Sequence, residues 1–137
     1  MGEEHLKFAG DWTTISSENV EEMLIMLKAP FMVRKAAPRL KPAQTISFNG
    51  TVMKINVVTT FKTKESNVPI DGSQFKDEMF GQVFSGKAEI CEGGMIKTEG
   101  NLDGISLVTE RKLNAEDEMV LISYVGDVTC TRIFARK

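Results

Sequence analysis

Turn signals recur at intervals of about ten residues from Gln44 onward, and this rhythm constrains the fold more than any other feature. Between the turns, apolar residues alternate with polar ones, as Ile46 and Phe48 do before Asn49-Gly50. Such alternation is typical of short antiparallel strands that bury one face. The turn signals are Asn49-Gly50, Asp71-Gly72, Gly81, Gly86, Gly93-Gly94, Asp103-Gly104, Asn114 to Glu118 and Gly126-Asp127. The pattern predicts an antiparallel β-barrel or sandwich.

The chain before Gln44 follows a different order. Residues 8–15 read as a first strand, in which Phe8, Trp12 and Ile15 are apolar. Two segments with helical spacing follow, and prolines end the second of them at Pro38 and Pro42. Their apolar positions are Val20, Met23, Leu24 and Leu27, then Val33, Ala36, Ala37 and Leu40. One strand, a helical pair and then many hairpins predict a barrel with a helical lid.

The length of 137 residues predicts one domain spanning residues 1–137. A net charge of −2 argues against a nucleic-acid partner, and no apolar run is long enough to span a membrane as a helix. The N-terminus has no features of a secretory signal, so we expect a cytoplasmic protein in which Cys91 and Cys130 are reduced. The two cysteines fit no metal spacing, and we expect neither a metal nor another cofactor.

The sequence offers little material for catalysis. The single histidine, His5, is expected in a frayed terminus, so no catalytic set can form around it. We expect the carboxylates of Glu21-Glu22, Asp77-Glu78 and Glu116-Asp117-Glu118 to be solvated, and no glycine-rich phosphate loop is present. We therefore do not expect an enzyme.

Two arginines stand out because their strand neighbours are apolar. A period of two places Arg132 on the same face as Cys130 and Phe134, and Arg111 shares a strand with Leu107 and Leu113. If these faces point inward, each guanidinium must be paired or held for a ligand. A carboxylate is its natural partner, since the fork of N–H groups matches two oxygens. The alternative is that Arg132 lies exposed on an edge strand.

The charges are unevenly distributed along the chain. Between Met23 and Lys64 there is no Asp or Glu, but there are eight cations: Lys28, Arg34, Lys35, Arg39, Lys41, Lys54, Lys62 and Lys64. Either this stretch is an ordinary solvated face or it docks on an anionic membrane or an acidic partner. Lys28, Arg34, Lys35 and Arg39 are the expected membrane-docking residues, on the outer side of the helices.

The chain resembles the intracellular lipid-binding protein family, which includes fatty-acid-binding and cellular retinoid-binding proteins. The resemblance runs along nearly the whole chain. It rests on Phe8-x-Gly10-x-Trp12, Ser17-Glu18-Asn19, Glu21-Glu22, Arg34-Lys35, Lys41-Pro42, Thr60-Phe61-Lys62, Phe75-x-Asp77-Glu78 and Thr131-Arg132-x-Phe134. It implies an all-β fold: a flattened, ten-stranded antiparallel barrel, calycin-like, with a helix-turn-helix cap between the first and second strands.

The family's ligand carboxylate lies near two arginines and a tyrosine inside the barrel. The resemblance assigns these places to Arg132, supported by Arg111, and to Phe134, which lacks the tyrosine hydroxyl. Phe61 matches a residue at the family's portal. The other residues expected at the cavity or portal are Met23, Met26, Met32, Phe75, Met79, Phe80, Leu121 and Cys130. The link Lys28-Ala29-Pro30 departs from the family, whose helices are usually joined through a glycine.

The resemblance implies a carrier protein, and the expected ligand is a long-chain fatty acid or a similar hydrophobic carboxylate. A carrier of retinoic acid or another hydrophobic acid is the alternative in the same fold. An interaction protein that docks through its basic helical cap is the alternative from another class. We expect a monomer that makes transient contact with anionic membrane surfaces.

Overall fold

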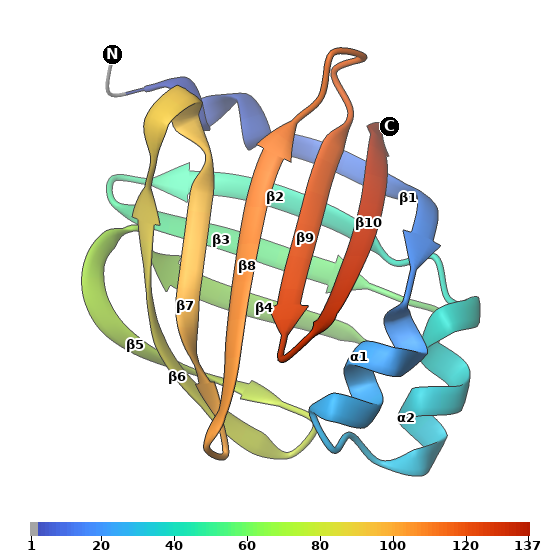
Figure 1. Ribbon diagram of the computed structural model, residues 1–137. Coiled ribbons are helices and arrows are strands. Elements are labelled where there is room, and N and C mark those ends of the chain that lie inside the picture. The colour runs from blue at the N-terminus through green and yellow to red at the C-terminus, as the bar shows by residue number, and fades with distance from the viewer. Residues whose placement is uncertain (1–2) are drawn as a thin grey trace.

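The computed structural model describes residues 3–137, and most of that range belongs to one antiparallel sheet of ten strands (Figure 1). The strands are β1 (Gly10–Glu18), β2 (Ala43–Asn49), β3 (Val52–Val58), β4 (Thr63–Pro69), β5 (Asp71–Met79), β6 (Gln82–Ile90), β7 (Ile96–Leu102), β8 (Ile105–Leu113), β9 (Met119–Val125) and β10 (Val128–Arg136). Tight turns join most of them where glycine or asparagine was expected, but the turn expected at Gly86 is wrong, since this glycine lies within β6. Gly50, for example, has φ of +62° in the turn after β2, a conformation that glycine adopts without strain.

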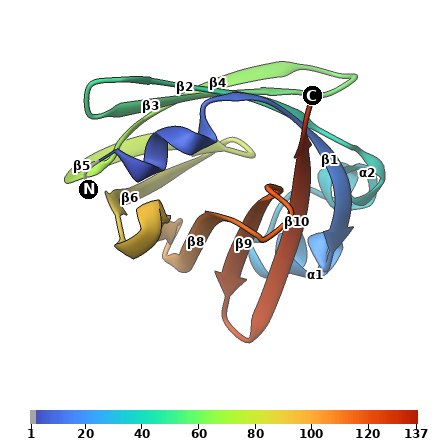
Figure 2. The ribbon, with the colours of Figure 1, turned by 90° about the horizontal axis from the view of Figure 1, so that it is seen from above.

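The sheet curls into a nearly closed barrel. Its strand order is β4-β3-β2-β1-β10-β9-β8-β7-β6-β5, so the first and last strands of the chain are paired. The two ends of the sheet, β4 and β5, lie next to each other without a backbone ladder between them. Seen from above, β2 to β4 form one layer and β6 to β10 the other (Figure 2). The predicted flattened barrel of ten antiparallel strands is confirmed.

Two short helices, α1 (Val20–Met26) and α2 (Phe31–Ala36), lie between β1 and β2 and cover one end of the barrel (Figure 1). Their apolar stripe buries Val20 and Leu24 against Cys130 of β10. The helical spacing of the second segment extends to Leu40, but its α-helical part ends at Ala36 and continues as the 3-10 turn η2 (Ala37–Arg39). Pro38 accounts for this change, because proline has no N–H group to continue the α-helical ladder.

The opposite end of the barrel is closed by the 3-10 helix η1 (Glu4–Phe8) and the turn η3 (Glu92–Gly94). Two expectations are wrong here. The first strand begins at Gly10, and Phe8 belongs to η1. His5 is not in a frayed terminus: it is buried, with its ring 5.1 Å from that of Phe48. Packing of η1 against β2 and η3 explains its burial.

The largest apolar cluster lies around this closed end and includes Phe8, Trp12, Ile46 and Phe134. The indole N–H of Trp12 donates to the Phe8 carbonyl at 2.9 Å, so the polar atom of this buried ring is satisfied. A second cluster with Leu27, Phe84 and Leu102 lies nearer the cap. None of the helices in residues 3–137 has the length and apolar character needed to cross a bilayer.

Candidate functional site

The barrel encloses a cavity of about 360 Å³, within the usual range of roughly 300–1,000 Å³ for small-molecule sites. Apolar side chains from both layers form much of its wall: Met53, Ile55, Val57, Val68, Phe75, Met79, Phe80, Phe84, Ile96, Leu107 and Leu121. Polar side chains occupy the rest: Gln44, Thr59, Lys62, Lys64, Ser66, Asp77, Glu78, Thr98, Thr109 and Arg111. Such a wall accommodates an amphipathic molecule.

The strand register places Arg111 and Arg132 in one row across three strands. Leu121 of β9 pairs with Arg111 of β8 on one side and with Arg132 of β10 on the other. Residues paired in this way point to the same face of the sheet. Two strand spacings separate the arginine Cα atoms by about 10 Å. Arg111 lines the cavity, whereas Arg132 lies outside its lining.

Arg111 is buried, with 6% of its surface exposed, and its contacts are neutral. Its Nη1 donates to Gln44 Oε1 at 3.0 Å and lies 3.2 Å from Met119 Sδ. Burial lowers the pKa of Arg111 to about 10, so the side chain is still a cation near neutral pH. Within residues 3–137 it has no ion-pair partner. An anionic group in the cavity would supply the missing charge.

Arg132 is half-buried, and its Nη1 donates to Ser17 Oγ of β1 at 3.0 Å. Burial also lowers the pKa of this guanidinium. Like Arg111, it lacks a carboxylate partner in the described part of the chain. The row therefore holds two unneutralised cations on the inner face of the sheet.

Phe134 lies two residues beyond Arg132 on the same face and is completely buried. It pairs with Thr14 of β1 and Met119 of β9 and belongs to the apolar cluster at the closed end. The ring is not part of the cavity wall. Its position gives the arginine row an apolar neighbour in place of a hydroxyl donor.

The other expected cavity and portal residues divide into three groups. Phe75, Met79, Phe80 and Leu121 line the cavity. Met23 of α1 and Cys130 of β10 pack in the apolar cluster between cap and barrel and do not line the cavity. Met26, Met32 and Phe61 are exposed on the surface and also lie outside the lining, with Phe61 and Met32 exposed by 78% and 77%. Phe61 follows β3 in the segment between Thr59 and Lys62, two residues that line the cavity.

The expected membrane-docking cations lie on or beside the cap, but they are not all free. Lys28 and Arg39 are exposed, whereas Lys35 forms an ion pair with Glu21 at 2.7 Å. Arg34 is half-buried, with its guanidinium 5.5 Å from the centre of the Phe31 ring. The cap thus combines exposed cations with an exposed aromatic ring.

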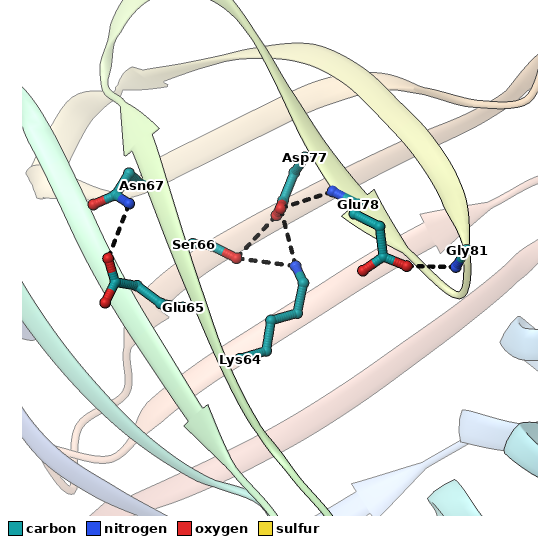
Figure 3. A network of polar contacts seen from close by, with 7 residues as sticks. All are labelled: Lys64, Glu65, Ser66, Asn67, Asp77, Glu78 and Gly81. Carbon is teal, nitrogen blue, oxygen red and sulfur yellow. Dashed lines mark hydrogen bonds and ion pairs between the residues drawn. The ribbon is translucent and has the colours of Figure 1, made fainter.

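Sequence reasoning missed several of the polar groups. Gln44 and Ser17 were not identified as partners of the arginines, although Gln44 has the same parity as Ile46 and Phe48 on β2. The expectation that Asp77 is a solvated carboxylate in a turn is wrong. Asp77 lies within β5, lines the cavity and bonds to Lys64 and Ser66 of β4 (Figure 3).

Comparison with known proteins identifies the class. The chain is 34% identical to mouse (Mus musculus) cellular retinoic acid-binding protein 2, over 95% of this chain and 98% of that protein. It is 30% identical to the adipocyte fatty acid-binding protein of the penguin Pygoscelis papua, over 95% and 97%. The solved structure of the REP1-NXSQ fatty acid transporter superposes with a TM-score of 0.85 at 28% identity, over 94% of this chain and 95% of that one. No protein-family model matches the chain.

The chain belongs to the intracellular lipid-binding protein family, as its barrel, helical cap and relatives together establish. The relatives named here are binding and transport proteins by their descriptions. The resemblance predicted from the sequence motifs is confirmed.

Proposed function

We propose that the protein binds a long-chain fatty acid in its cavity and carries it through the cytoplasm as a monomer, without catalysis. One observation carries the proposal: a buried arginine, Arg111, lines an apolar cavity and has no acidic partner among residues 3–137. An unpaired buried cation costs free energy that an incoming carboxylate offsets. The relatives' names point to the same class of ligand.

The ligand carboxylate lies against Arg111, with Arg132 adding positive charge from the same row. The sequence suggested the reverse order, but Arg111 is the arginine in the cavity wall. Its guanidinium can bond to both oxygens of a carboxylate while Gln44 holds it in position. The acyl chain then extends along the apolar wall that Met53, Ile55 and Phe75 line.

Retinoic acid is the second candidate ligand. It presents the same carboxylate to the arginines, and the mouse retinoic acid-binding protein shares 34% of aligned residues with this chain. The resemblance also favours it, because it implies that the turn from Asn114 to Glu118 is similar in length to that of the family's retinoic-acid binders. Its rigid polyene requires a differently shaped cavity from a flexible acyl chain, so the two acids compete unequally.

The cap is proposed to dock on anionic membrane and bring the cavity close to the bilayer. Three apolar side chains are exposed on the cap or in the connection between β3 and β4: Phe31 by 59%, Met32 by 77% and Phe61 by 78%. Lys28 and Arg39 add exposed positive charge beside them. Aromatic and basic side chains together suit the interface between headgroups and acyl chains.

Organic extraction and mass spectrometry of the natively purified protein test the proposal. A saturated or unsaturated long-chain acid, near one molecule per chain, is the expected result. Recovery of retinoic acid supports the second candidate. A reproducibly empty barrel that also fails to bind added palmitic acid would contradict both, and would leave the basic cap as a docking surface for a protein partner.

A further inference from the structure

Three polar side chains meet inside the cavity, away from the arginine row (Figure 3). Lys64 Nζ of β4 lies 3.0 Å from Asp77 Oδ1 of β5 and donates to Ser66 Oγ at 3.1 Å. Ser66 Oγ donates to Asp77 Oδ2 at 2.9 Å. The alternating burial along β4 and β5 shows that the side chains of Lys64, Ser66 and Asp77 point inward, whereas Glu65 and Asn67 face outward. We call Lys64, Ser66 and Asp77 the inner polar cluster.

The inner polar cluster stands at a defined place relative to Arg111. Gln44, which accepts the hydrogen bond from Arg111, pairs with Val57, and Val57 pairs with Lys64. Gln44 and Lys64 therefore belong to one row, with Cα atoms about 10 Å apart across two strand spacings. Val57, Ile55 and Val68 form the apolar wall around this row. The cavity is thus polar on two sides and apolar between them.

The chemistry of the two polar sides differs. The arginine row has a net positive charge, but in the inner polar cluster one cation and one anion neutralise each other. A second full charge on a ligand would disturb that balance, whereas a hydroxyl group would not. Its proton can go to a free lone pair of Asp77, and its oxygen can accept from the third N–H of Lys64.

A plain hydrocarbon chain in this position removes water from the cluster and offers no hydrogen bond in return. The side chains of Lys64 and Asp77 are 29% and 25% exposed, so a ligand in the cavity can reach them. We infer that the inner polar cluster selects acyl chains that carry a hydroxyl group partway along their length, so that long-chain hydroxy fatty acids are the preferred ligands. This inference rests on the proposed function, because it assumes that the carboxylate lies at the arginine row.

Calorimetric titration with palmitic acid and its monohydroxy isomers tests the inference. We expect one isomer, or two adjacent ones, to bind at least as tightly as palmitic acid, and the others to bind more weakly. The variant Lys64→Met/Asp77→Leu removes both charges together and leaves no unpaired ion. It should weaken the preferred isomer by about tenfold while palmitic acid changes by less than about threefold.

A matched control is available on the outer surface of the same strands. Lys54 and Glu65 form an ion pair at 3.7 Å on the outside of the barrel, so Lys54→Met/Glu65→Leu removes a comparable pair that no cavity ligand can touch. This variant should keep the wild-type ranking of the isomers.

Two results would overturn the inference and leave the proposed function standing. In one, every hydroxy isomer binds the wild-type protein more weakly than palmitic acid does. In the other, Lys64→Met/Asp77→Leu ranks palmitic acid and its hydroxy isomers as the wild-type protein does. The inner polar cluster would then serve only to bridge the gap between β4 and β5. The first comparison uses only the wild-type protein, so it needs no variant to fold. Failure of all these acids, palmitic acid included, to bind the wild-type protein would overturn the proposed function itself.

Discussion

The burial of the Arg111 guanidinium costs free energy, and no acidic side chain in residues 3–137 offsets that cost. The cation is buried against neutral partners, and this burial lowers its pKa to about 10. A protein built only for stability would place an apolar residue there, because replacing buried charge by well-packed apolar groups is often stabilising. The unpaired buried charge at this position therefore favours an anionic ligand.

Replacing this arginine should therefore stabilise the ligand-free protein. We expect Arg111→Met to raise the free energy of unfolding by about 1–3 kcal/mol at pH 7, measured by urea denaturation of delipidated protein. Above pH 10 the folded protein releases the proton while the unfolded chain still holds it. Wild-type stability then rises with pH, and the difference between the two proteins shrinks.

The exposed neighbour on the same strand gives the control. Lys112→Met on the outer side of β8 should change the free energy of unfolding by no more than about 0.5 kcal/mol. A loss of stability in Arg111→Met at pH 7 would mean that the arginine is a structural element rather than a site held for a ligand.

A substitution at Phe134 tests the position of the ligand carboxylate by adding a hydroxyl group near the arginine row. Phe134→Tyr places a hydroxyl at the tip of a fully buried ring on the same face as Arg132. A new hydrogen bond to the ligand carboxylate contributes about 0.5–1.5 kcal/mol, so palmitic acid should bind roughly two- to tenfold more tightly by calorimetry. Unchanged affinity in a folded variant would place the carboxylate elsewhere, or show that water already fills this role.

At the scale of elements, periodicity predicted the strands and the two helices because the barrel buries one face of nearly every element. The expected extent of the first strand was wrong because a buried apolar residue need not belong to a strand. Phe8 is as buried as a strand residue would be, but it lies in a 3-10 helix that closes the barrel end. Local spacing cannot distinguish these cases, since both bury the same side chain.

The site was less predictable than the fold because polar partners come from distant strands. Parity and the family motif together pointed to Arg111 and Arg132, but Gln44 lies 67 positions from Arg111 in the chain and Ser17 lies 115 from Arg132. The sequence predicts a surface position for Asp77 because its chain neighbours, Lys76 and Glu78, are polar. Only the approach of β4 to β5 places it beside Lys64.

The link between α1 and α2 contains one residue, Lys28, with a strained backbone conformation, and a substitution there shows how much this strain lowers the free energy of unfolding. Lys28 has φ of +57°, in the left-handed region where the family's usual glycine would fit without cost. We expect Lys28→Gly to raise the free energy of unfolding by about 0.5–1 kcal/mol, measured by thermal or urea denaturation.

The matched variant Lys28→Ala removes the same charge but keeps a Cβ atom, so it should not stabilise the protein. Equal effects of the two substitutions would show that charge, rather than backbone conformation, determines the stability of this link.

At the scale of the whole molecule, the charge distribution predicts how the ligand is delivered. Each Lys or Arg near an anionic membrane contributes about 1 kcal/mol of attraction, which decays within a Debye length of roughly 8–10 Å. Only cations without acidic partners contribute fully, so Lys28 and Arg39 matter more than Lys35, which is paired with Glu21.

Ligand transfer to vesicles should therefore depend on collision. The rate should rise with vesicle concentration and anionic lipid content, and it should fall with salt. Lys28→Ala/Arg39→Ala should slow transfer to anionic vesicles several-fold and leave transfer to neutral vesicles nearly unchanged. A rate that does not depend on vesicle concentration would mean that the ligand leaves through water.

A comparison of two ligands tests whether the arginine row binds a ligand carboxylate. Palmitic acid and its methyl ester share the same chain, but only the acid is an anion. Calorimetry should show that the wild-type protein prefers the acid by about tenfold to a hundredfold, the range given by one charge-assisted hydrogen bond. Arg111→Gln should abolish most of that preference and Arg132→Gln part of it, while both variants bind the ester as the wild-type protein does. An undiminished preference for the acid in both folded variants would mean that the carboxylate does not bind at the arginine row.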